Sequence, residues 1–183
     1  MHSGCHFVSS ATLEIVSLKP FSCVQIAISA GIINMLINAP LGWALVPAGE
    51  VLHCWGVPGV AFDLVTTAFG SAAGTVLIVT PQIRRQVAMG KLAPPNLSPY
   101  LREWLARWPL GAMARALKVG AFTVLISAPL PLITLALLDS PSFDRLGFTS
   151  LKASFAFVVG ALITPLIAAA ATVERHHPAG RSR

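Results

Sequence analysis

Apolar residues gather along the chain in four long runs that are separated by more polar stretches. The runs cover about 21–46, 57–81, 119–138 and 154–173. Each run reaches the roughly 20 helical residues that the hydrocarbon core of a bilayer requires. The runs are apolar on every side and do not alternate with a period of two, and a backbone in lipid must satisfy its own hydrogen bonds. The pattern therefore predicts an all-α integral membrane protein with four transmembrane helices.

The segments around these runs complete the predicted organisation. Residues 1–20 have only Lys19 as a basic start, and the apolar run that follows exceeds the short core of a signal peptide, so we expect the first run to remain a span. The expected parts are an N-terminal tail over 1–20, a first transmembrane hairpin over 21–81, a basic loop over 82–118, a second hairpin over 119–173 and a C-terminal tail over 174–183.

The basic loop contains a short amphipathic pattern. Ser98 followed by Pro99 is typical of a helix start, with proline at the first helical position. Four apolar residues then recur at helical spacing, which predicts an interfacial helix with tryptophans at headgroup level, or a surface for a partner protein or anionic lipid. The stripe is Leu101, Trp104, Leu105 and Trp108, and the interfacial anchors expected at the opposite surface are Trp43 and Trp55.

The first and third runs resemble each other. Residues 31–41 and 120–130 are identical at six of eleven positions, at an offset of 89 residues. The second and fourth runs share a Thr-Pro ending, at 80–81 and 164–165. We interpret this as an internal repeat of two hairpins inserted in the same direction, although apolar sequences also resemble one another by chance.

Composition and charge agree with the membrane interpretation. Apolar residues make up 55% of the chain and charged residues 11%, against about 45–50% and about 25% in soluble domains. Eleven Lys and Arg residues lie in the tails and the central loop, and two, Arg145 and Lys152, lie at the opposite tips. The positive-inside rule then places both termini in the cytoplasm, and the composition suits a bacterial inner membrane. The net charge of +6 thus requires no nucleic acid.

Two polar pairs lie inside the spans. Asn34 and Asn38 are one helical turn apart in the first span, and Thr123 and Ser127 repeat that spacing in the third. We expect the two pairs to face each other across the bundle. They would either form hydrogen bonds between helices or line a path for a small solute or ion.

Prolines and glycines mark further features of the spans. Pro40, Pro129 and Pro131 predict helix kinks, because each removes a backbone donor and frees a carbonyl one turn earlier. Such kinks serve as hinges or ligand sites, or are plain bundle geometry. Gly70 and Gly74 form a G-x-x-x-G pattern, which predicts a packing face within or between subunits.

Asp63 is the one acidic residue expected inside a span. An intramembrane carboxylate indicates a proton or cation site. The alternative is a structural role, because Asp63 lies near the outer surface and near a helix N-terminus, whose partial positive charge favours an anion.

The sequence contains none of the common catalytic or metal-binding motifs that we considered. The five histidines lie in the tails or in one tip, the three cysteines are scattered, and no C-x-x-C, G-x-S-x-G, H-E-x-x-H or phosphate-loop motif occurs. We expect no metal, no cofactor and no enzymatic activity. A membrane enzyme acting on lipid would have only Asp63 and scattered hydroxyls to work with.

In size the chain resembles the small multidrug transporters, which carry an acidic residue in the first span. This chain has Asn34 and Asn38 there instead. The T-P-x-x-R-R motif at residues 80–85 is similar to short two-helix bacterial membrane proteins of unknown function. Neither resemblance assigns a role to a residue here.

These observations favour a small permease-like inner-membrane protein. Its two hairpins would rock around the two polar pairs, with Asp63 as an outer proton site, and the bundle would form a homo-oligomer in the bilayer. The alternative is a non-catalytic accessory or assembly subunit of a larger membrane complex. In that case the Gly70–Gly74 face and the Trp104–Trp108 segment would be docking surfaces.

Overall fold

A computed structural model describes residues 23–92, 97–108, 111–138 and 141–175. The expected N-terminal tail and most of the C-terminal tail lie outside the described residues. Helices account for 80% of the described part. Four spans are long and apolar enough to cross a membrane, which indicates a multi-pass membrane protein.

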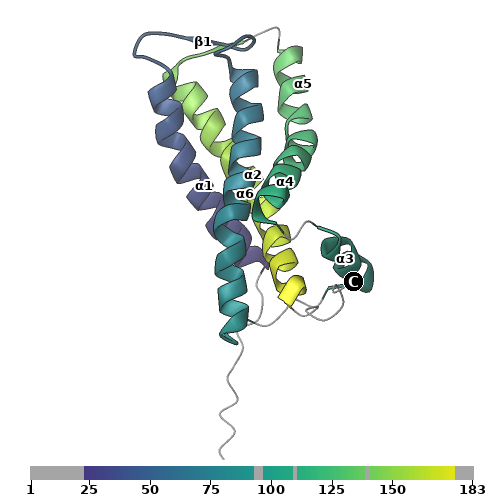
Figure 1. Cartoon of the computed structure of the whole chain (residues 1–183). Helices are drawn as coiled ribbons and strands as arrows, with labels where there is room; N and C mark the ends of the chain where they lie inside the picture. Colours follow the sequence, from purple (N-terminus) through teal and green to yellow (C-terminus); the bar gives the residue numbers. More distant parts are fainter. Residues whose placement is uncertain (1–22, 93–96, 109–110, 139–140, 176–183) are drawn as a thin grey trace, which may run out of the picture.

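Six helices and a small ribbon make up the structure (Figure 1). The first, second and fourth spans are single helices, and the third consists of two consecutive helices. In chain order the helices are α1 (Cys23–Leu45), α2 (Val60–Ala88), α3 (Pro99–Ala106), α4 (Ala112–Ser127), α5 (Pro129–Leu137) and α6 (Arg145–Arg175). The described ends of the chain, at the start of α1 and the end of α6, lie at the same end of the bundle.

Prolines interrupt one of the spans. The third span breaks at Ala128, directly before Pro129, and α5 continues from there. Pro129 and Pro131 remove two backbone donors within one turn, which makes a continuous helix costly at this place. By contrast, α1 runs without interruption through Pro40.

The second, third and fourth spans are longer than the apolar runs that predict them. Helix α2 continues from the expected end at residue 81 to Ala88. Arg85 lies in its last turn, where the helix dipole favours a cation. Helix α6 begins at Arg145, before the expected start at residue 154. The Asp144 carboxylate accepts a hydrogen bond from the Gly147 N–H at 2.9 Å and caps this start.

These extensions correct the assignment of three basic residues. Arg115 and Lys118 were assigned to the cytoplasmic loop, and the structure places both in α4. Lys152 was assigned to a hairpin tip, and the structure places it inside α6. Charged residues can lie in such helices when the protein surrounds them, and Arg115 and Lys152 are both buried.

Helix α6 holds the bundle together. The extensive helix contacts join α1 with α6, α2 with α6, and α2 with α4, so helices that follow one another in the chain are not the principal partners among those described. Two of these contacts need glycine. A Cβ at Gly31 would lie 2.8 Å from the Phe157 ring, and a Cβ at Gly120 would lie 2.8 Å from the Phe69 ring.

The loops between spans close one end of the bundle, which we call the strand end. Strand β1 (Leu52–His53) pairs antiparallel with β2 (Ser142–Phe143). The Arg145 Nε donates a hydrogen bond to the Trp43 carbonyl at 2.8 Å, and its guanidinium lies 4.1 Å from the Trp43 ring centroid. Val46, Cys54 and Phe148 form a buried cluster beneath the ribbon.

Helix α3 lies near the opposite end (Figure 1). As the sequence predicts, Ser98 caps it, and its hydroxyl accepts from the Leu101 N–H at 3.3 Å. Leu105 and Trp108 are buried in a core shared with α2, α4 and α6. Part of the apolar stripe of α3 therefore packs on the protein itself, whereas Trp43 and Trp55, at the strand end, are exposed.

Candidate functional site

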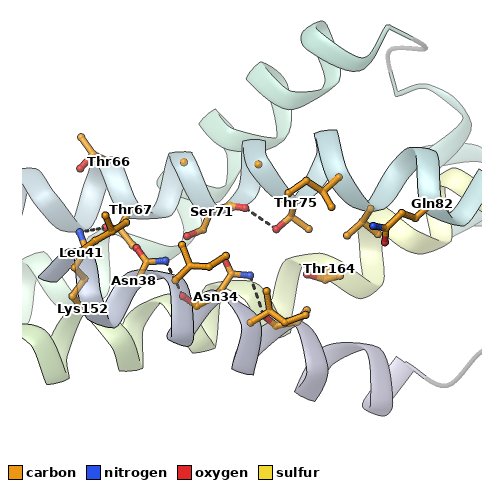
Figure 2. A pocket seen from close by; sticks show the side chains of 17 residues that line it. Asn34, Asn38, Leu41, Thr66, Thr67, Ser71, Thr75, Gln82, Lys152 and Thr164 are labelled. Carbon is orange, nitrogen blue, oxygen red and sulfur yellow. Dashed lines mark hydrogen bonds between the residues drawn. The ribbon is translucent and has the colours of Figure 1, made fainter. Parts of the chain in front are cut away.

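A groove runs between α1 and α2, with residues of α6 at its base. Its volume is about 530 Å³. Apolar residues such as Ile33, Ile37 and Ile78 contribute to its walls. Figure 2 shows the labelled polar side chains along the groove, with Lys152 at one end and Gln82 at the other. The polar lining consists of Asn34, Asn38, Thr66, Thr67, Ser71, Thr75, Gln82, Lys152 and Thr164.

Small residues of α2 keep the groove open. Gly70 and Gly74 both line it, and apart from the adjoining backbone of α2 no described atom lies within 4 Å of a Cβ built on either glycine. Helix α1 therefore does not close onto this face of α2. Within one copy of the described chain, the G-x-x-x-G pattern faces open space instead of a packed helix.

A buried ion pair lies at the strand end of the groove. The Lys152 Nζ donates to Asp63 Oδ1 at 2.5 Å and to Thr67 Oγ1 at 3.0 Å. The Thr67 hydroxyl donates in turn to Asp63 Oδ2, at 3.4 Å. Only 5% of the Lys152 side chain and 13% of the Asp63 side chain are exposed. Asp63 is thus held in a neutral pair and is not an isolated carboxylate.

Three helices meet at this pair. Asp63 and Thr67 come from α2 and Lys152 from α6, while Gly42 of α1 lies against the stem of the lysine. A Cβ at Gly42 would lie 3.1 Å from Lys152 Cδ. Because removing one partner would leave a buried charge uncompensated, this contact ties the strand ends of the helices together.

Lys152 is the charged site residue that the sequence does not predict, and Thr75, Gln82 and Thr164 of the groove are likewise absent from the predicted site. Lys152 lies 89 residues from Asp63, and the sequence pattern places it in a tip. The sequence signal that could have identified Lys152 is its charge. An acidic residue inside a span needs a cation at the same depth, and Lys152 directly precedes the fourth apolar run.

The two asparagines of α1 lie along the groove. Asn38 is buried and Asn34 is half-buried. Each Nδ2 donates to the backbone carbonyl four residues earlier, at 3.0 Å for Asn34 and 2.9 Å for Asn38. Each amide keeps its oxygen and a second N–H outside these bonds, and these groups can bind a solute. Gly160 makes room for Asn34, since a Cβ there would lie 2.5 Å from its Nδ2.

Thr123 and Ser127 lie elsewhere. Both belong to α4, and their hydroxyls donate at 2.8 Å to the carbonyls of Val119 and Thr123. Neither residue lines the groove. The structure therefore does not bring the two polar pairs together. A second hollow of about 510 Å³ lies beside the contact of α2 with α4, and its lining is apolar except for Thr66: Val65, Thr66, Phe69, Ala121, Val124 and Leu125.

The groove offers binding chemistry. It presents the Lys152 ammonium, which is paired with Asp63, together with three amides and several hydroxyls, and these groups can orient a ligand by hydrogen bonds and charge. In the described ranges, no group of three or more His, Cys, Asp or Glu side chains could hold a metal ion. Cys54 lies outside the spans, and burial raises the pKa of its thiol, which makes it a poorer nucleophile at neutral pH.

No protein-family model, curated protein or solved structure matches this chain.

Proposed function

We propose that the protein is permease-like and moves a small solute or ion along the α1–α2 groove. The groove itself carries this proposal. Polar residues inside a membrane are energetically costly and commonly mark a functional pathway. Here nine polar side chains line one open groove between apolar helices. An ion pair stands at one end of it.

Movement would separate two units of the bundle. One unit is α1 with α6 and the other is α2 with α4, and the two units meet along the extensive contact between α2 and α6. The Asp63–Lys152 pair links the units at the strand end. A solute that takes over either partner would loosen this link and allow the units to rock. This replaces rocking of one sequence hairpin against the other.

The placement in the cell is part of the same proposal. We place the protein in an inner or plasma membrane, with both termini and α3 on the cytoplasmic side and the strand end outside, because Lys and Arg are concentrated toward the α3 end. We also propose the internal repeat. Its support is the identity between 31–41 and 120–130, together with the matching contacts of Gly31 with Phe157 and Gly120 with Phe69.

The test compares groove variants with matched variants outside the groove. Purified protein in liposomes is assayed for swelling driven by small zwitterionic, cationic and neutral solutes. Asn34→Ala and Asn38→Ala should lower the flux about tenfold, because each removes a hydrogen-bonding group worth on the order of 1 kcal/mol or more. Thr123→Ala and Ser127→Ala should leave it unchanged, and equal effects of both pairs would refute the path.

One observation favours the accessory-subunit alternative. The Gly70–Gly74 face is open, and small residues let the helix of another protein approach closely. Purification from native membranes in mild detergent tests this role. A partner that co-purifies at a fixed ratio, and is lost in a Gly70→Leu variant but retained in Thr123→Ala, would support the accessory role over transport.

A further inference from the structure

We infer that the groove binds a zwitterionic amphiphile, with its charged head at the Asp63–Lys152 pair and one apolar chain lying toward Gln82. This names a ligand class for the site of the proposed transport function and rests on that proposal for the choice of site. Three properties of the groove lead to it: the distribution of charge, the balance of charge, and the depth of the pair in the membrane.

Charge is confined to one end of the groove. Lys152, paired with Asp63, is the charged residue that lines it. Further along, the Thr75 and Thr164 hydroxyls donate to carbonyls of their own helices at 2.7 Å, so they are satisfied without a ligand. The rims carry exposed isoleucines, including Ile33, Ile37 and Ile78. A ligand with a charged head and an apolar chain matches this distribution.

The balance of charge selects a zwitterion. A ligand with a single charge would pair with one partner of the Asp63–Lys152 pair and leave the other buried and uncompensated. A ligand with both charges can give an anionic oxygen to Lys152 and an ammonium N–H to Asp63 at once. The lysine ammonium has three N–H groups, and the contacts with Asp63 and Thr67 use two of them.

The depth of the pair suits a lipid head group. Helix α6 has 31 residues, whereas about 20 cross the hydrocarbon core, so a centred helix extends by roughly five residues at each side. Lys152 lies seven residues after Arg145 and therefore near the hydrocarbon boundary. The α1 wall from Ala30 to Leu41 is about 16 Å long at 1.5 Å per residue, which is about half the core thickness.

The ligand would enter from the bilayer. The loop cluster of Val46, Cys54 and Phe148 closes the strand end, whereas the isoleucines on the rims are exposed. A volume of about 530 Å³ lies within the usual range of ligand pockets, about 300–1,000 Å³. We therefore expect the head group and a single chain in the groove, with the rest of the lipid in the membrane.

Photo-crosslinking tests this inference without measuring transport. The full-length protein in lipid nanodiscs is exposed to a phosphatidylethanolamine that carries a photoreactive group in one acyl chain, and labelled peptides are mapped by mass spectrometry. We expect labelling of α1 and α2 residues along the groove. Unlabelled phosphatidylethanolamine should compete at least tenfold better than anionic phosphatidylglycerol or neutral diacylglycerol. Equal or stronger competition by either of these lipids would overturn the inference.

Paired variants keep the test independent of folding. Asp63→Asn with Lys152→Met removes both charges and leaves no buried charge unpaired, and labelling should fall at least tenfold. Asp63→Lys with Lys152→Asp reverses the pair and should retain labelling, because a zwitterion can turn round. Thr123→Ala serves as the control outside the groove. Folding is checked by thermal denaturation, and undiminished labelling in a folded Asp63→Asn, Lys152→Met protein would contradict the inference.

Two further results separate this inference from the proposed function. Lipid labelling without solute flux would uphold the ligand and refute the permease, whereas flux without labelling would do the reverse. A Ser71→Cys variant tests the rival occupant, a second copy of the chain. Efficient disulfide formation between copies through residue 71, with no lipid labelling, would show that protein fills the groove and would overturn the inference.

Discussion

The pair Asn34–Asn38 and the pair Thr123–Ser127 have the same spacing and fall at equivalent places in the two similar segments. The structure nevertheless gives them different surroundings. The asparagines line the open α1–α2 groove, whereas Thr123 is buried on α4 and neither Thr123 nor Ser127 lines that groove. The comparison teaches that the face presented by the neighbouring helix, and not the polar pair itself, decides whether a pair is available to a ligand.

Helix α2 is the neighbouring helix for both pairs, because one side of it faces α1 and another side faces α4. Toward α4 it presents Phe69, whose ring fills the space beside Gly120. Toward α1 it presents Gly70 and Gly74, beside which the space is open. Phe69 thus fills the space beside Gly120, and its neighbour Gly70 leaves the side toward α1 open. Substitutions on the groove side and on the α4 side of α2 probe this difference.

The largest effect should come from breaking the ion pair on the groove side. Lys152→Met leaves Asp63 buried without its cation and should lower the free energy of unfolding by about 3–5 kcal/mol. Adding Asp63→Asn should restore most of this loss. The control is Arg107→Met, which breaks an exposed pair with Glu103 and should cost less than about 1 kcal/mol. Unfolding titrations in detergent micelles measure all three variants.

Glycine substitutions should have opposite signs on the two sides. Gly120→Ala places a methyl group against Phe69 and should cost about 1–3 kcal/mol through overpacking. Gly70→Ala meets open space and should be neutral or stabilise the helix by up to about 1 kcal/mol. Thermal denaturation of the two variants compares them directly. Equal losses would show that both sides of α2 are packed.

The polar pairs should have similar effects on stability and different effects on flux. Thr123→Ala removes a hydrogen bond worth about 0.6 kcal/mol on average in membrane helices, and Asn38→Ala should cost a similar amount. Only Asn38→Ala should reduce solute flux, because its amide faces the groove. Unfolding and flux are measured on the same preparations, so that a lower flux caused by unfolding is distinguished from a lower flux in folded protein.

The smallest effect concerns the closed end of the groove. Burial raises the pKa of the Cys54 thiol, so less of it is thiolate at neutral pH. A maleimide should label Cys54 more slowly than the exposed Cys23, and the Cys54 rate should keep rising with pH beyond the ordinary thiol pKa of about 8.5. Rapid labelling of Cys54 at pH 7 would mean that the strand end is open.

Much of the fold follows from the sequence, because apolar runs of sufficient length leave a chain in lipid few choices. The four spans and the cap at Ser98 are examples. The sequence does not reveal which helices pack against each other, because long-range contacts such as that between Asp63 and Lys152 depend on how helices rotate and cross. The assignment of Lys152 to a tip failed for this reason, because a charge that looks unfit for a span becomes acceptable once it is paired.

The most direct test of the account measures access to the two sides of α2. In a variant without native cysteines, Ser71→Cys is placed in the groove and Thr123→Cys on the α4 side, and both are labelled in membranes with a small membrane-permeant thiol reagent. Ser71→Cys should be labelled at least tenfold faster, because residue 71 lines an open groove and residue 123 is buried. Equal rates, or faster labelling of Thr123→Cys, would contradict it.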